Sequence, residues 1–329
     1  MLRPKVLLVS LGGTITMTRN DAGAITPTLS ADDLLRAVPG IGEVAEIEAV
    51  SPMRLPGASL TIDNLLDVAT LLDAHLAGDA AGAVVIQGTD TIEETAFVLD
   101  LLVKSEKPVV VTGAMRGAEA AGADGPANIL SAVTVAADPR SVAQGCLVVL
   151  NDEIHAARFV QKAHTALPSA FVSPLAGPIG LVTEGAAAFH LRVAKPEPVA
   201  IGAARGDKPV ALVGMALGDD GRILPALAGL GYCGVVLSAM GAGHVPAVVV
   251  PLVNDLIPVM PVVLATRVHT GPVFSKTYGF PGSETDLLAR GVVSAGGLGP
   301  LKARLLLSLL LRRETDRTQI ERTFGSYAY

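Results

Sequence analysis

Short apolar runs alternate with longer stretches of helical periodicity along most of the chain. Strands of a parallel sheet read as unbroken apolar runs, because helices cover both faces of the sheet. Four such runs predict strands in the first half: Val6–Ser10, Ala83–Gln87, Val109–Thr112 and Cys146–Leu150. Helices are predicted between them, including Ile92–Lys104 and Asn128–Ala137. This alternation predicts an α/β fold with a doubly wound, mostly parallel sheet.

The pattern lapses after Ala187, where prolines interrupt a segment without clear periodicity. We interpret this segment, residues 189–207, as a linker between a larger N-terminal domain, residues 1–188, and a smaller C-terminal α/β domain, residues 208–329. A length of 329 residues agrees with two cores rather than one. The C-terminal elements are predicted as strands at Val210–Val213, Val235–Leu237, Val262–Ala265 and Val292–Val293, and helices at Val248–Leu256 and Leu301–Leu311.

Composition narrows the choice of partners. The net charge of -6 gives no basic surface for a polyanion, and aromatic residues at 3% are too few for base stacking, so nucleic acid is not expected. The opening apolar stretch is shorter than that of a signal peptide, and the apolar segment Ala247–Ala265 is broken by Asn254, Asp255 and three prolines. We therefore expect a cytoplasmic protein that does not enter a membrane.

Cys146 and Cys233 are expected to pack in the core.

Two turns at strand ends carry candidate chemistry. The first strand runs directly into Gly12, Gly13 and Thr14, so a hydroxyl group follows two glycines that let the backbone approach a ligand closely. An ordinary glycine turn with a solvent-facing threonine explains the same residues equally well.

A later strand has the same layout, in the order Gln87, Gly88, Thr89, Asp90, Thr91. Thr91 is the better candidate for a helix cap, because Glu94 three residues on can complete a capping box. That assignment leaves Thr89 and Asp90 available for a site. The alternative is that Asp90 and Thr91 are simply helix caps.

Together these segments resemble the bacterial-type asparaginase/glutaminase family over nearly the whole chain. The motifs that carry the resemblance are Leu11–Ile15, Gly88–Ala96, Thr112–Arg116, Ala123–Asn128, Leu150–Asp152 with Lys162, Ser238–Gly243, Arg267–Gly271, Ser294–Arg304 and Gln319–Phe324.

The resemblance implies roles for particular residues. Thr14 matches the primary nucleophile, and Thr89, Asp90 and Lys162 match a Thr–Asp–Lys triad, with Asp90 also binding the ammonium group of the substrate. Glu284 matches a glutamate that reaches into a neighbouring subunit's site, which implies a homo-oligomer, either a dimer or a tetramer. The other expected substrate contacts are Gly13, Ala58, Ser59, Gly88, Ala114 and Tyr278.

The implied chemistry is coherent. A threonine hydroxyl is a poor nucleophile and needs a base beside it, which a partly desolvated lysine can supply. Thr14 would form an acyl-enzyme, ammonia would leave, and water would complete the hydrolysis. Neither a metal nor a cofactor is expected.

Three positions depart from the family pattern. The family has a tyrosine on the loop after the nucleophile, whereas this chain has no tyrosine before Tyr232. We hypothesise that Tyr278 replaces it, from another direction. Ala58, with Ser59 beside it, stands where a serine grips the α-carboxylate of the substrate, and Ala242 stands where an asparagine is common.

Three functions follow from this combination of an intact catalytic set and altered recognition. The first is hydrolysis of the side-chain amide of L-asparagine or a related small amide. The second is an amidase, or a lactam or lactone hydrolase, that acts on a specialised metabolite. The third, from another class, is a small-molecule binding protein that keeps the fold without turnover.

Overall fold

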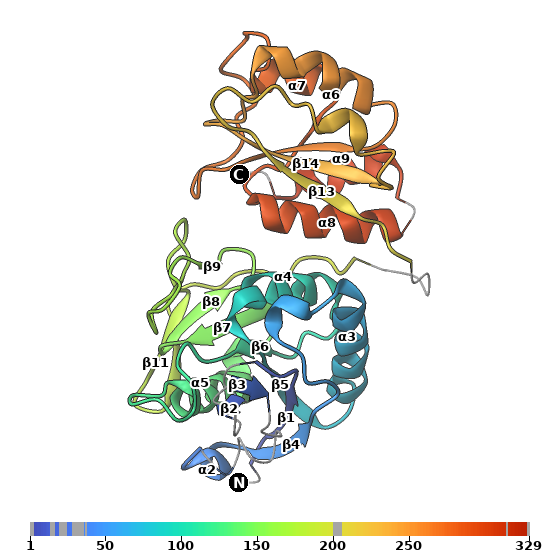
Figure 1. The fold of residues 1–329 in the computed structure, drawn as a ribbon. Helices are drawn as coiled ribbons and strands as arrows, with labels where there is room; N and C mark the ends of the chain where they lie inside the picture. The colour runs from blue at the N-terminus through green and yellow to red at the C-terminus, as the bar shows by residue number, and fades with distance from the viewer. Residues whose placement is uncertain are drawn as a thin grey trace. The chain divides into compact units, whose positions relative to one another are not determined.

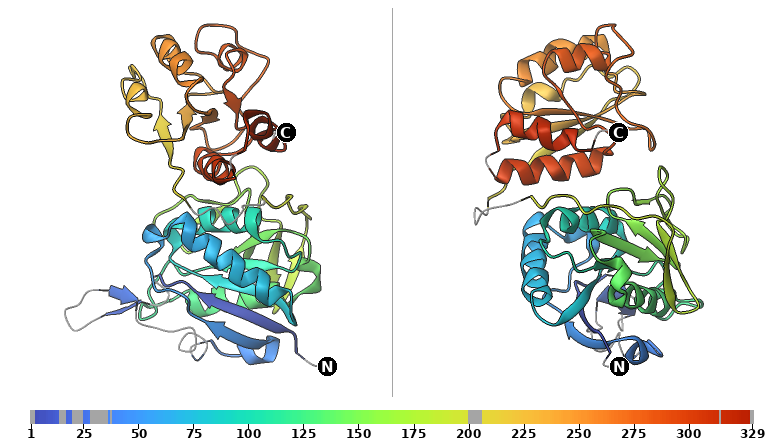
Figure 2. Two further views of the ribbon diagram at one scale, coloured as in Figure 1. Left: turned by 90° about the vertical axis from the view of Figure 1, so that its right-hand side faces the viewer. Right: turned by 180° about the vertical axis from the view of Figure 1, so that it is seen from behind.

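The computed structural model describes residues 3–13, 17–19, 25–27, 36, 38–199, 206–313 and 315–327. The chain divides into two compact units, Met1–Pro198 and Val199–Tyr329 (Figure 1, Figure 2). Within the predicted linker, residues 190–199 form neither helix nor strand.

An eight-stranded sheet forms the centre of the first unit, in the order β12-β11-β8-β7-β6-β5-β1-β4. The neighbouring strands β4, β1, β5, β6 and β7 are all parallel. Beyond β7, the strands β8, β11 and β12 each pair antiparallel with their neighbour. The bounds are β1 Lys5–Ser10, β4 Glu46–Val50, β5 Ala80–Ile86, β6 Val109–Thr112, β7 Cys146–Leu150, β8 Glu153–Ala156, β11 Gly180–Thr183 and β12 Ala186–Phe189. The prediction of a doubly wound, mostly parallel sheet is confirmed.

Helices cover both faces of this sheet. On one face, α3 (Ile62–Leu76) and α4 (Ile92–Leu102) pack against each other and the sheet. On the other face, α5 (Gly125–Ala137) and the short α2 (Ile41–Val44) share one core with alternate side chains of β1, β5, β6 and β7. The helix α3 is not among the predicted elements, although it begins with a capping box between Thr61 and Asn64.

The order of the strands places a topological switch point between β1 and β5. The chain passes from β1 to β4 on one side, and then crosses β1 to continue through β5, β6 and β7 on the other. Ligands of open α/β sheets bind outside the carboxyl ends of the strands at such a point. The connection from β5 to β6 passes through α4 on one face of the sheet, and the connection from β6 to β7 passes through α5 on the other face. Both connections step toward the same edge of the sheet, so the two crossovers have opposite hands.

Several short elements decorate the first unit. The strands β2 (Met17–Arg19) and β3 (Ile25–Pro27) pair antiparallel, as do β9 (Gln161–Lys162) and β10 (Phe171–Val172). The short 3-10 helices are η2 Gly57–Ser59, η3 Thr89–Thr91 and η4 Pro139–Ser141.

The second unit contains a parallel four-stranded sheet in the order β13-β14-β15-β16. One core joins this sheet to α6 and α7, and α8 packs on β13, β14 and β15 (Figure 1). The bounds are β13 Val210–Gly214, β14 Gly234–Ala239, β15 Val262–Thr266, β16 Val293–Ser294, η5 Leu224–Ala226, η6 Ala247–Val249, α6 Val250–Leu256, α7 Glu284–Ala289, α8 Pro300–Arg312 and α9 Arg317–Gly325.

Two local predictions need correction. The helix predicted to reach Lys104 ends at Leu102, because Lys104 and Ser105 donate their backbone N–H groups to the Asp73 carboxylate instead. Cys146 is buried as predicted, but Cys233 lies only half-buried, just before β14. Among the described residues, no helix is long and apolar enough to cross a bilayer.

Candidate active site

Three glycine turns meet at the carboxyl ends of β1 and β5. Gly12 and Gly13 follow β1 with φ of 112° and 94°, which an L side chain rarely adopts. An ideal Cβ on Gly13 would lie 2.0 Å from the Gly88 nitrogen, and one on Gly57 would lie 2.8 Å from the Gly88 oxygen. The backbones of these turns therefore touch directly, and no side chain fits between them.

Thr89, Asp90 and Lys162 come together beside this junction. The Lys162 Nζ atom lies 2.9 Å from Thr89 Oγ1 and 2.9 Å from Asp90 Oδ1. Thr89 is buried, the Lys162 side chain is 16% exposed, and the Asp90 side chain is 69% exposed. The amine thus links a buried hydroxyl to a carboxylate that faces solvent.

A short hairpin presents Lys162 to the helix start. The backbone N–H of Lys162 donates to Glu93 Oε1 on α4 at 3.2 Å. On the paired strand β10, Phe171 lies opposite Lys162 and is buried, which anchors the hairpin in the core. Sequence reasoning missed Glu93, whose only local signal is its place two residues after the helix-start threonine.

The capping prediction for Thr91 is wrong. Its side chain makes no hydrogen bond to the N-terminus of α4. Instead, the hydroxyl donates to the Gly57 carbonyl at 3.0 Å and accepts from Gln87 Nε2 at 3.1 Å. The Thr91 hydroxyl therefore bonds to Gly57 and Gln87 and not to the first turn of α4.

The end of β6 is fixed by a polar network. Asp124 accepts the backbone N–H groups of Met115 and Arg116 at 2.9 and 2.8 Å. Buried Asn128 donates to the Gly113 carbonyl at 2.9 Å and accepts the Asn151 N–H at 2.9 Å. This network explains the Ala123–Asn128 motif as a brace for the segment that contains Ala114, which is itself buried.

The remaining predicted contacts of the first unit differ in exposure. Gly13 and Gly88 are buried at the glycine junction, whereas Ala58 and Ser59 are exposed on η2. Thr14, the expected nucleophile, lies outside the described residues.

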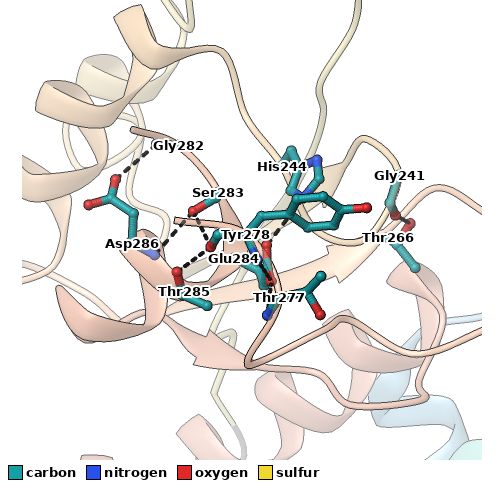
Figure 3. Close-up of polar contacts among 10 residues, drawn as sticks. All are labelled: Gly241, His244, Thr266, Thr277, Tyr278, Gly282, Ser283, Glu284, Thr285 and Asp286. Atoms are coloured by element: carbon teal, nitrogen blue, oxygen red, sulfur yellow. Dashed lines mark hydrogen bonds and ion pairs between the residues drawn. The ribbon is translucent and has the colours of Figure 1, made fainter. Parts of the chain in front are cut away.

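Glu284 belongs to a separate polar cluster in the second unit (Figure 3). Its side chain is fully buried at the start of α7 and accepts the backbone N–H groups of Thr277 and Tyr278 at 3.1 and 2.8 Å. His244 Nε2 lies 3.2 Å from the other carboxylate oxygen. The His244 ring meets those of Tyr278 and Phe280 edge to face, at 4.9 and 5.1 Å between centroids.

The charge on Glu284 is stabilised by these donors. Burial alone would raise the pKa of its carboxyl group, but the N–H groups of Tyr278 and Thr277, together with His244, lower the pKa below its usual range. His244 is not among the residues predicted from the sequence, although it comes directly after the Ser238–Gly243 motif. Tyr278 is 42% exposed, and its replacement of the missing loop tyrosine stays a prediction.

In the part of the chain that the structure describes, no three His, Cys, Asp or Glu side chains gather as they would around a metal ion. The fold and the first-unit site define a class: a two-domain α/β protein whose sheet edge holds a hydroxyl–amine–carboxylate set at a topological switch point.

Comparison with known proteins places the chain within this class. The model of the family "Asparaginase, N-terminal" matches residues 5–195, and that of the "Glutaminase/Asparaginase C-terminal domain" matches residues 209–324. The chain belongs to the asparaginase/glutaminase family of amidohydrolases.

Similar proteins match over nearly the full length. A probable L-asparaginase of Deinococcus radiodurans is 37% identical, covering 98% of this chain and 97% of that protein. A probable periplasmic L-asparaginase of Haemophilus influenzae is 32% identical, covering 98% and 93%. The crystal structure of a probable cytoplasmic L-asparaginase from Campylobacter jejuni has a TM-score of 0.88 at 31% identity, covering 98% and 99%.

Proposed function

We propose that this chain hydrolyses the side-chain amide of L-asparagine or a related small amide through a threonine nucleophile, releasing ammonia. The observation that carries the proposal is the position of Lys162 Nζ, 2.9 Å from both Thr89 Oγ1 and Asp90 Oδ1. A hydroxyl, an amine and a carboxylate in one hydrogen-bonded chain are the groups that proton transfer in amide hydrolysis requires. The names of the similar proteins support the substrate class.

In this proposal Thr14 attacks the amide carbon to form an acyl-enzyme. Lys162 and Thr89 move protons, while Asp90 orients the amine and binds the ammonium group of the substrate. Backbone N–H groups of the glycine turn and of Thr89 stabilise the tetrahedral oxyanion, each worth about 3 kcal/mol. The departing nitrogen takes a proton and leaves as ammonia, and water then hydrolyses the ester.

A second candidate is an amidase, or a lactam or lactone hydrolase, that acts on a substrate lacking one charged group. Ala58 favours it, because an exposed methyl group on η2 offers no hydrogen bond to a carboxylate. A site that binds a charged substrate group with hydrogen bonds discriminates strongly against analogues that lack this group, and a site without the anchoring side chain loses that discrimination.

We also propose a homo-oligomer, a dimer or tetramer, in which the segment around Glu284 completes the site of a neighbouring subunit. The proposal is supported by three exposed aromatic side chains on that segment: Phe274, Tyr278 and Phe280 are 41%, 42% and 47% exposed. A cytoplasmic location stays a prediction, since the similar proteins include one named cytoplasmic and one named periplasmic.

The test measures ammonia release from L-asparagine without added metal, comparing Lys162→Met with Lys107→Met. Lys107 Nζ donates to the Gly78 carbonyl on the surface, so its variant controls for the loss of a lysine elsewhere. We expect Lys162→Met to lower kcat by a factor of about 10² to 10⁴, the usual range for a lost proton carrier, and Lys107→Met to leave it unchanged.

Two further measurements separate the alternatives. A folded Thr14→Ala variant with full turnover would rule out this nucleophile. A panel with N-substituted and decarboxylated asparagine analogues distinguishes the two candidates, because only the second hydrolyses the decarboxylated analogue better than asparagine. Native activity in folded Lys162→Met would refute the proposed triad.

A further inference from the structure

The Thr91 hydroxyl joins two turns that are far apart in sequence. It donates to the carbonyl of Gly57 in η2 and accepts from Gln87 at the end of β5. One turn contains Ala58 and Ser59, and the other contains Thr89 and Asp90. The hydroxyl therefore sits between the expected recognition turn and the expected proton-transfer turn.

Gln87 extends this link into the core. Its side chain is fully buried, and Nε2 donates both to Thr91 Oγ1 at 3.1 Å and to the Gly88 carbonyl at 3.2 Å. Among the described residues, the Gln87 Oε1 atom has no hydrogen-bond partner. The two hydrogen bonds from Nε2 therefore tie the buried Gln87 amide to both Gly88 and Thr91.

The backbone geometry makes this link sensitive. Gly57 and Gly88 are in direct contact, since an ideal Cβ on Gly88 would lie 3.1 Å from the Gly57 nitrogen. The two glycines bring no side chains to that contact, and the nearest side-chain atom to an ideal Cβ on Gly57 is Thr91 Oγ1, at 3.3 Å. The Thr91–Gly57 bond is a side-chain hydrogen bond that crosses directly between the two turns.

We propose that Gln87 and Thr91 are positioning residues that fix the recognition turn, residues 57–59, to the proton-transfer turn, residues 88–91. Neither residue takes part in a chemical step; they set where the substrate lies relative to Thr89 and Asp90. The catalytic part of this inference rests on the proposed function, whereas the mechanical coupling of the two turns does not.

The test compares Thr91→Val with Thr91→Ser. Valine keeps the shape of threonine and removes both hydrogen bonds, while serine keeps the hydroxyl. Thr134→Val is the matched control, because the Thr134 hydroxyl likewise donates to a carbonyl, that of Leu130, within α5. The control removes one comparable hydrogen bond without touching either turn.

We expect Thr91→Val to lower kcat/KM about tenfold, with KM raised as well as kcat lowered, because small displacements of substrate from reacting groups are costly. Thr91→Ser should recover most of the loss, and Thr134→Val should lower the melting temperature without changing either constant. Native constants in a folded Thr91→Val variant would overturn the catalytic part.

Amide hydrogen exchange measures the coupling between the two turns in the absence of substrate. In Thr91→Val, amide protection should fall by about tenfold in both residues 57–60 and residues 88–91, and neither should change in Thr134→Val. Unchanged protection in Thr91→Val would refute the coupling itself. If the native chain hydrolyses no amide but the exchange result holds, the proposed function and the catalytic part fail while the coupling stands.

Discussion

Replacing Gly13 with alanine tests the glycine junction on which the site geometry depends. The added Cβ would lie 2.0 Å from the Gly88 nitrogen and 2.3 Å from its Cα, distances that no real contact of this kind shows. Gly13 also has a φ of +94°, so alanine would be strained there whatever the space. The methyl group can be accommodated only if the Gly88 turn moves, and Thr89 moves with it.

The expected magnitude has two parts. Positive φ costs an alanine about 1–2 kcal/mol, and overpacking against a backbone that cannot rotate away costs about 1–3 kcal/mol more. Gly185→Ala isolates the first part, since Gly185 has a φ of +72° with nothing within 4 Å of its ideal Cβ. At about 2–4 °C per kcal/mol, the first variant should melt several degrees below the second.

The assay follows thermal unfolding and amide hydrolysis of both variants. Because the chain has two units, melting midpoints rather than free energies of unfolding are compared. Gly13→Ala should lose at least tenfold in kcat/KM while Gly185→Ala stays close to native. If the two variants melt together and both keep native kinetics, the direct contact between the Gly13 and Gly88 turns does not exist.

Two other predictions concern buried titratable groups. Burial lowers the pKa of His155 on β8 from 6.5 to about 4, so the unfolded chain binds a proton that the folded chain rejects; this contribution to stability is full above pH 6.5 and falls by about 3 kcal/mol as the pH drops to about 4. His155→Gln should flatten that part of the stability curve in denaturant titrations, and an unchanged slope would contradict the assignment. Burial also raises the pKa of the Cys146 thiol, so an aromatic disulfide reagent should label half-buried Cys233 first and Cys146 only on unfolding. Rapid labelling of both thiols in the native protein would contradict the burial of Cys146.

Much of the fold follows from local pattern. The apolar runs that form β1, β5, β6 and β7 are buried on both faces. Strands of that kind can be predicted from local sequence alone, because they are continuous apolar segments. Carboxyl ends of adjacent parallel strands lie at one edge, so the turns after β1 and β5 had to be neighbours once the strand order was known. The helix α3 was missed, although its residues Thr61 and Asn64 form a local capping box.

The site was legible only in part, because its bonds cross long distances in sequence. Lys162 and Thr89 are 73 residues apart, and no periodicity in the sequence predicts the hydrogen bond between them. Only the resemblance to the family indicated that the two residues belong to one site. The Thr91 prediction failed for the same reason. Thr91 stands at the N-cap position, but its hydroxyl donates to the Gly57 carbonyl, 34 residues away, and accepts from Gln87 Nε2 rather than from a backbone N–H group of α4. Propensity rules describe competition within a segment and have no term for such a partner.

In the proposed site, the contacts that place Thr89 and Lys162 do not involve the side chain of residue 58. Thr89 and Lys162 are placed by backbone contact at Gly88 and by a hairpin anchored in the core, neither of which involves residue 58. The turn that carries Ala58 is placed by Gly57, through its backbone contact with Gly88 and its carbonyl bond to Thr91. A change of side chain at position 58 can therefore alter which substrate group the turn meets without moving the proton-transfer groups. Under the proposed function, position 58 could thus vary without a change in the Thr89–Lys162 geometry. It also means that such a variation should appear mainly in KM, whereas changes at Gly57, Gln87 or Thr91 should appear in kcat as well.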